Sequence, residues 1–229
     1  MSDYKNISDY PKNIPIFPLG GVLLLPKSRL PLNIFEPKYL KMIEDVLATE
    51  HRFIGMIQPK STKKNDAETT PRFNNVGCVG RLISFTETED SRYLITLSGI
   101  SRFNYVKKVD TFKPYIKAEV DWSNFRNDGV LEKLPTSFNK NDFLEIISEY
   151  FKITNLQTDW ESLIKADDEL LINSLSILCP FENDEKQALL EAKTIKERVA
   201  ILTTLMEMSI KAETTFGPLQ SKKTTQNLT

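Results

Sequence analysis

The sequence predicts an α+β fold, with a mostly-β N-terminal domain that contains one inserted helix, followed by a C-terminal α-helical bundle. Three observations support this prediction. Up to about residue 122, runs rich in β-branched and aromatic residues are separated by turn-forming residues. After residue 137, apolar residues recur at helical spacing. The chain has 229 residues, 40% of them hydrophobic and 27% charged, so it can bury a substantial core.

The first apolar segment, residues 14–25, reads IPIFPLGGVLLL. Its two prolines cannot donate hydrogen bonds to a neighbouring strand, which predicts an edge strand or extended chain. The glycine pair that follows permits a turn. We therefore expect the run VLLL, residues 22–25, to form a short buried strand.

The stretch LPLNIFEPKYLKMI, residues 30–43, passes from extended chain to helix. Pro37 suits the first helical position, because its missing N–H group would have no partner inside the helix. Apolar residues then recur every three or four positions to about residue 49. Glu36 precedes the proline, and we expect its carboxylate to cap the helix N-terminus. A second hypothesis pairs Glu36 with Arg102.

The remaining strands are expected at residues 52–59, 76–85, 92–97, 100–109 and 114–122. The turn signal ETED, residues 87–90, joins two of them in a hairpin, and Gly99 marks a bulge or bend. Residues 60–72 lack apolar periodicity, which is typical of a solvated loop.

The second half of the chain has the spacing of short helices, four or five in number. Helical patterns cover residues 141–152, 167–181, 183–192 and the segment from 194 onward. In that last segment, Thr194 and Glu197 match a capping box. The predicted organisation is a flexible arm at 1–12, the β-rich domain at 13–122, a connector at 123–136, the bundle at 137–212 and a disordered tail at 213–229.

The charges are balanced, with 30 Lys and Arg against 31 Asp and Glu. This balance gives no long-range attraction to nucleic acid or to anionic lipid. The N-terminus lacks the pattern of a signal peptide, and its longest apolar run is too short to span a bilayer. We expect a cytoplasmic protein with no membrane partner; the oligomeric state is not defined by the sequence.

Signatures of catalysis, nucleotide binding and metal binding are missing. The sequence has no GxxxxGK[ST], GxGxxG, HExxH, GxSxG or CxxC motif. Cys78 and Cys179 are expected to be buried thiols, with a disulfide as the alternative. His51 is the only histidine. We predict no catalytic residues, no metal and no cofactor, with an unrecognised hydrolase as the alternative.

Aromatic residues flank polar ones at two places in the β-rich half. These residues are Phe35, Tyr39, Phe103 and Tyr105 around Glu36, Arg102 and Asn104. One interpretation is that the rings fill the core and the ions form a buried pair. The other is a groove in which aromatic rings hold the apolar side chains of an extended polypeptide.

Several ordered motifs resemble one family. IPIFPLGGVLLLPKSRLPLNIFEPKYLKMIED resembles the opening of the Lon protease N-terminal, substrate-binding domain. GCVGRLISFTETEDSRYLITLSGISRF, PYIKAEVDW and NDEKQALLEAKTIKERVAIL resemble the segments that follow in that family. The similarity extends over roughly residues 12–210.

The resemblance implies a PUA-like β pseudo-barrel followed by a helical bundle. It also implies a non-catalytic module that binds proteins or peptides, with an adaptor role in protein quality control. Small-molecule or RNA binding by the barrel is the alternative. The ATPase and peptidase modules of the protease have no counterpart here, so a free-standing member is expected. The matching motif residues, which are the candidate peptide-binding residues, are Phe35, Glu36, Tyr39, Gly99, Arg102 and Phe103.

Overall fold

The computed structural model describes residues 9–60, 72–130, 132–136 and 138–216. Most of the expected arm and tail, and the central part of the expected loop at 60–72, lie outside the described residues. The loop is closed at its base, where Pro59 bridges to Phe73 and the Lys60 N–H group donates to the Arg72 carbonyl at 2.8 Å.

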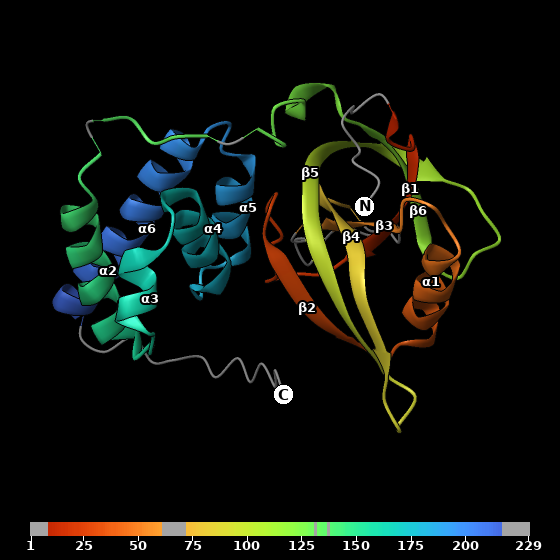
Figure 1. Cartoon of the computed structure of the whole chain (residues 1–229), viewed down its shortest axis with the longest axis horizontal. Coiled ribbons are helices and arrows are strands. Elements are labelled where there is room, and N and C mark those ends of the chain that lie inside the picture. The colour runs from red at the N-terminus through yellow and green to blue at the C-terminus, as the bar shows by residue number, and fades with distance from the viewer. Residues whose placement is uncertain (1–8, 61–71, 131, 137, 217–229) are drawn as a thin grey trace.

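Six strands form one mixed sheet in the first half of the chain (Figure 1). They are β1 (Asn13–Pro18), β2 (Arg29–Ile34), β3 (Phe53–Ile57), β4 (Val76–Glu87), β5 (Tyr93–Val109) and β6 (Ile116–Asp121). Their order is β2-β5-β4-β3-β1-β6, and β6 also pairs with β5. The strands β5, β4, β3, β1 and β6 therefore close into a barrel, and β2 extends the sheet beyond β5.

Strand β5 serves two partners because it is 17 residues long. Its first part, from Tyr93 to Ser98, pairs with β2, and its last part, from Asn104 to Val109, pairs with β6. A register shift opposite β4 follows Gly99, since Gly80 pairs with Gly99 and Val79 with Ser101. The bulge expected at Gly99 is thus confirmed.

One helix, α1 (Pro37–Leu47), is inserted between β2 and β3. It begins at Pro37 as predicted, and its buried face consists of Tyr39, Met42, Ile43 and Val46. The strand expected at residues 22–25 is wrong, because this run forms no strand although its three leucines are buried. These leucines fill the core from an irregular segment, whose Leu25 carbonyl accepts a local hydrogen bond from the Ser28 hydroxyl.

The second half is a bundle of five helices in the described part of the chain (Figure 1). They are α2 (Lys140–Thr154), α3 (Trp160–Lys165), α4 (Asp168–Leu178), α5 (Asn183–Glu191) and α6 (Ile195–Phe216), preceded by the short 3₁₀ turn η2 (Ser123–Phe125). Helix α6 packs against α2, α4 and α5. The predicted α+β class is confirmed.

Three details of the bundle differ from expectation. Helix α3 was not predicted, because its six residues bury no side chain and so carry no apolar stripe. Helix α6 reaches Phe216, so residues 213–216 belong to it and not to a tail. Thr194 does cap α6 by accepting from the Glu197 N–H group, but the Glu197 carboxylate accepts from Lys193 and not from Thr194.

The two halves share a hydrophobic core. One cluster of buried side chains joins residues of the barrel, such as Leu24 and Leu97, to residues of the bundle, such as Leu175 and Phe181. A second cluster lies on the other side of the sheet, around Phe103 and residues of β1, β3 and β6. The bundle is therefore packed on the barrel and is not merely tethered to it.

Candidate functional site

The six candidate residues fall into an exposed pair and a buried group. Phe35 and Glu36 lie at the surface, between the end of β2 and the start of α1. Tyr39, Gly99, Arg102 and Phe103 are buried. The six therefore do not line one common groove.

Glu36 occupies the N-cap position of α1, and its carbonyl accepts the first helical hydrogen bonds from Tyr39 and Leu40. Its carboxylate makes no capping hydrogen bond, which corrects the expectation from the sequence. The carboxylate instead forms an exposed ion pair with the Lys38 ammonium group at 2.9 Å. Glu is not among the residues that are preferred at the N-cap position.

Tyr39 is a core residue. It is 8% exposed, and its ring lies 4.2 Å from that of Phe17, centroid to centroid. Burial raises the pKa of its hydroxyl group. Tyr39 forms the motif FE..Y with Phe35 and Glu36, and this geometry supports a structural role for it.

Phe35 belongs to an exposed apolar surface on the strands around the β4–β5 hairpin. Phe35 is 62% exposed, Leu94 43% and Phe85 39%. Phe85 packs edge-on against Tyr93 at 4.8 Å, and the Arg92 guanidinium lies 5.9 Å from the Phe35 ring. Successive residues of a strand face opposite sides of the sheet, so Leu94 lies on one face of the hairpin and Tyr93, with Phe85 packed on it, lies on the other. We call Phe35, Phe85, Tyr93 and Leu94 together the hairpin surface, which has two faces.

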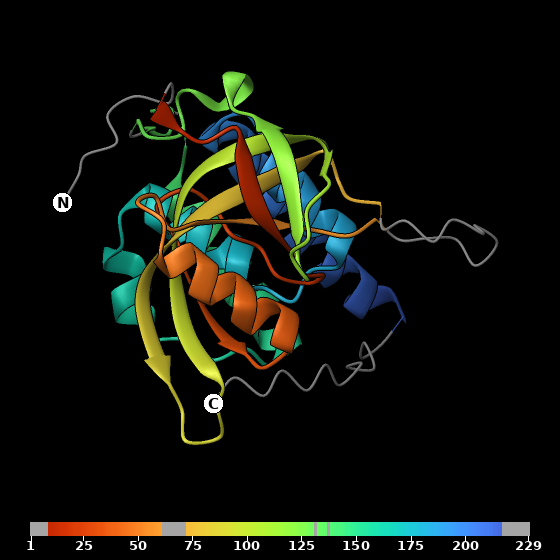
Figure 2. The same cartoon turned by 90° about the vertical axis from the view of Figure 1, so that its right-hand side faces the viewer.

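The hairpin surface is held together by the sheet. Tyr93 pairs with Ile34, the residue before Phe35, and Leu94 pairs with Asn33. Across the hairpin, Leu94 pairs with Thr86. The paired ends of β4 and β5 project past the rest of the barrel (Figures 1 and 2). The paired strands thus present apolar side chains to solvent, and exposed apolar patches of this kind often mark sites of interaction.

Arg102 lies at the junction of barrel and bundle. Its guanidinium pairs with the Asp128 carboxylate at 2.6 Å, and the Arg102 N–H group donates to the same carboxylate at 2.7 Å. It also donates to the carbonyls of Leu190 and Ala192 at the end of α5. The hypothesis that Arg102 pairs with Glu36 is wrong, because Arg102 is buried while Glu36 is on the surface.

Asp128 is a residue that sequence reasoning missed. It lies in NDG, residues 127–129, within the segment that the sequence predicts to be a connector. Its side chain is 6% exposed and is matched by Arg102, which is 5% exposed. An aspartate beside asparagine and glycine predicts a turn, but nothing in this pattern indicates that its partner is Arg102, 26 residues away.

A small polar cavity of about 20 Å³ adjoins this ion pair, with room for about one water molecule. Arg102, Asp128, Glu132, Asn173 and Arg198 are among its lining residues. Burial lowers the pKa of Arg198 to about 10, and the charge of Arg102 adds to the effect. The cavity is too small for an organic ligand, so we interpret it as part of the junction.

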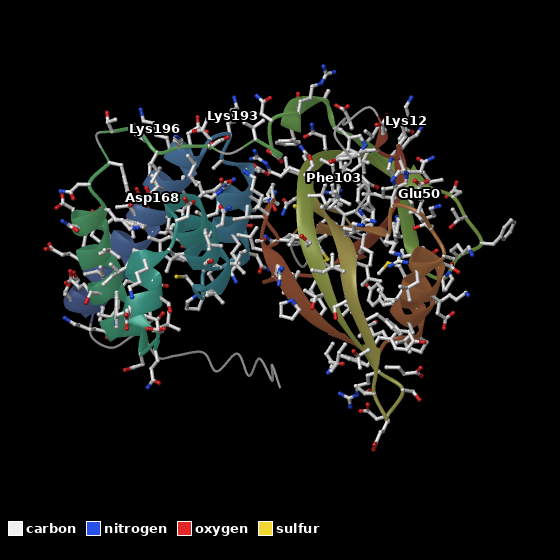
Figure 3. All side chains as sticks on the ribbon, viewed as in Figure 1. Lys12, Glu50, Phe103, Asp168, Lys193 and Lys196 are labelled. Carbon is white, nitrogen blue, oxygen red and sulfur yellow. The ribbon has the colours of Figure 1, made fainter. Side chains whose placement is uncertain are left out.

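Gly99, Arg102 and Phe103 form the motif G..RF, and packing accounts for Gly99 and Phe103. A Cβ atom at position 99 would lie 2.0 Å from the Leu25 carbonyl oxygen, so the chain at 24–28 approaches β5 too closely for any side chain. Phe103 is fully buried inside the barrel, against Trp122 at 5.9 Å (Figure 3). The geometry of this motif thus supports a structural role.

No reactive centre is formed by the cysteines. Cys78 and Cys179 are buried free thiols, which excludes the disulfide alternative. Burial raises the pKa of both, that of Cys179 to about 12, so neither is a thiolate at neutral pH. In the described ranges, no group of three His, Cys, Asp or Glu side chains could hold a metal ion. A bilayer-spanning helix is also absent from the described part, where each helix is too short or too polar.

The barrel and bundle define a class of domain that is known from solved structures. The crystal structure of a Lon N-terminal domain protein from Xanthomonas campestris matches with a TM-score of 0.54 and 18% identity, covering 84% of this chain and 97% of that one. The N-terminal domain of the Mycobacterium avium complex Lon protease matches with a TM-score of 0.56 and 15% identity, covering 86% and 98%. The fold is that of a Lon N-terminal domain.

The sequence comparison identifies the family of the chain. Residues 13–208 match the family of the ATP-dependent protease La (LON) substrate-binding domain, and the chain belongs to this family. It is 26% identical over 208 residues to Lon protease 2 of Sorangium cellulosum, covering 85% of this chain and 24% of that protein. It is 27% identical over 212 residues to the Lon protease of Flavobacterium johnsoniae, covering 91% and 25%. The chain thus spans about a quarter of the length of these relatives.

Proposed function

We propose that this chain is a non-catalytic module that binds polypeptides in a non-native, extended state. Membership of a substrate-binding family supports the class of ligand. The observation that carries the proposal is the hairpin surface, where Phe35 beside the hairpin, and Phe85 and Leu94 on its two faces, are exposed to solvent. Contact between these exposed side chains and the apolar side chains of an unfolded segment removes apolar surface from water, which favours binding.

The alternative of a small-molecule site has less support. Two of the cavities in the described part measure about 20 and 180 Å³. Sites for organic ligands typically measure roughly 300–1,000 Å³. The net charge of −1 also gives no general attraction to RNA.

The test is a titration with a permanently unfolded polypeptide, reduced and carboxymethylated lactalbumin, followed by fluorescence anisotropy. We expect binding to the wild-type chain and roughly tenfold weaker binding to Phe35→Ser and to Leu94→Ser, because each loses a large apolar contact. Phe112→Ser is the matched control, since Phe112 is a fully exposed ring on the β5–β6 loop. No binding to the wild type, or equal loss with Phe112→Ser, would contradict the proposal.

The finer form of the proposal is an adaptor in protein quality control, which transfers the captured polypeptide to a protease. Its test adds the chain to a Lon protease that is degrading the same lactalbumin. Faster degradation with wild type than with Phe35→Ser is the expected result. Unchanged rates would leave a binding module without the adaptor role.

A further inference from the structure

Strand β2 is the open edge of the sheet. It pairs with β5 on one side, and among the described residues the sheet provides no strand on its other side. Its outward positions, Arg29, Pro31 and Asn33, are all exposed. β2 also leads directly into Phe35 of the hairpin surface, so this edge and that surface are continuous.

The ladder shows which backbone groups point to the open side. The Gly99 N–H group donates to the Ser28 carbonyl at 2.9 Å, which sets the alternation along β2. In an antiparallel pair, every second residue directs its N–H and C=O groups toward the partner. Leu30, Leu32 and Ile34 therefore direct their backbone N–H and C=O groups toward β5. The alternate residues direct theirs toward the open side. Pro31 fits this register, since it has no N–H group to offer β5.

The open side thus presents the N–H groups of Arg29 and Asn33 and the carbonyl groups of Arg29, Pro31 and Asn33. Among the described residues, no hydrogen bond outside the strand ladders involves these backbone groups. A row of donors and acceptors at the spacing of a strand matches an extended backbone, and an added strand is a known way for proteins to hold extended peptides. Helices satisfy their own backbone groups and cannot match it.

We propose that an extended segment of a polypeptide substrate adds to β2 as a further strand of the sheet. This inference rests on the proposed function and names how the same surface recognises its ligand: through the main chain, with little dependence on sequence. The proline at position 31 removes one donor from the middle of the edge, a feature that discourages pairing between edges of identical chains. The remaining groups still allow five main-chain hydrogen bonds with a guest strand.

The side chains next to the edge favour an apolar guest at alternate positions. Leu32 lies on the same face of β2 as the buried Leu30 and Ile34, but it is only partly buried at the rim of the core. A strand added beside β2 would direct every second side chain to the face that carries Leu32, and one of these side chains would lie next to Leu32. An apolar side chain there would extend the core cluster.

The test uses a short fluorescein-labelled peptide of alternating valine and threonine, flanked by lysines, and a second peptide of the same sequence N-methylated at every second residue. The methyl groups remove donors on one edge without changing the side chains. On the protein, Asn33→Pro removes an outward N–H group, Asn33→Thr keeps it as the matched control, and Pro31→Val supplies the missing one. Circular dichroism checks the fold of each variant.

We expect Asn33→Pro to weaken binding about two- to tenfold and Pro31→Val to strengthen it by a similar factor, since each changes one hydrogen bond. Asn33→Thr should bind as wild type does, and the N-methylated peptide should bind weakly. If Asn33→Pro fails to fold, Pro31→Val and the methylated peptide still decide the question.

Two failures are distinguishable. Binding of both peptides with equal affinity, unaffected by Pro31→Val, would overturn strand addition while the proposed polypeptide binding stands. No binding of either peptide or of unfolded lactalbumin would overturn both. A wild-type chain that dimerises in analytical ultracentrifugation, with Asn33→Pro monomeric, would show that the edge serves a second copy of the chain instead.

Discussion

At the scale of single residues, the contacts of Arg102 show why the motif of Gly99, Arg102 and Phe103 contains an arginine. Its guanidinium contacts two separate segments: the turn after η2, at Asp128 and at the ring of Phe125 at 4.7 Å, and the end of α5, at Leu190 and Ala192. A planar group with five donors suits such a position better than lysine would. The structure thus gives the G..RF motif a reason in packing and hydrogen bonding.

Removing Arg102 should therefore destabilise the fold strongly. We expect Arg102→Ala to lower the free energy of unfolding by about 3–5 kcal/mol, because Asp128 is left buried without its charge partner. Arg92→Ala is the matched control: Arg92 pairs with Asp90 in an exposed ion pair, and its loss should leave the free energy of unfolding almost unchanged. Urea unfolding measures both, and equal losses would contradict a stabilising role for the buried ion pair between Arg102 and Asp128.

At the scale of elements, Asp45 fixes the β5–β6 loop to helix α1. Its carboxylate accepts a hydrogen bond from the Tyr115 hydroxyl at 2.7 Å and pairs with Lys113 at 2.9 Å. Within α1 it also pairs with Lys41, one turn earlier, at 3.2 Å. One carboxylate near the C-terminus of a helix thus orders a loop 70 residues away.

The pH dependence of stability should show this contact. The Lys113 ammonium, together with Tyr115 and Lys41, lowers the pKa of Asp45 from 3.8 to about 2. The folded-state pKa is below the unfolded one, so the contribution of Asp45 is complete above about pH 4 and is lost as the pH falls toward 2. Urea midpoints measured across this range should fall less steeply for Asp45→Asn than for wild type. Parallel curves would show that Asp45 does not titrate as described.

The start of α1 shows what an element reveals in its sequence and what it conceals. Pro37 and the apolar stripe predicted the helix, because both act within one turn of chain. The role of Glu36 was not predictable in the same way, since its carboxylate had competing local partners and Lys38 was the nearer one. Local patterns therefore define where elements begin more reliably than what their side chains bind.

At the scale of the whole molecule, periodicity shows which face of an element is buried but not what buries it. The residue pattern predicted a β-rich half followed by a helical bundle, and the family resemblance predicted that the β-rich half is a barrel. Two contacts join positions that are too far apart in the sequence for any local pattern to predict. They are the ion pair between Arg102 and Asp128, and the hydrogen bond from Gln187 on α5 to the Val76 carbonyl at 3.1 Å. The exposure of the β2 edge likewise depended on closure of the barrel elsewhere.

The shared core makes a prediction about the whole molecule: barrel and bundle should unfold in one transition. The hydrophobic cluster that joins them would lose one wall if either unfolded alone, which exposes apolar surface of both. The two tryptophans separate the signals, since Trp122 lies buried in the barrel and Trp160 begins α3 of the bundle. In Trp160→Phe, urea unfolding followed by Trp122 fluorescence should coincide with the loss of helical circular dichroism, which arises mainly from the bundle. Arg102→Ala should move both curves together to lower urea, whereas a bundle signal that separates from the barrel signal in the wild type would show two independent units.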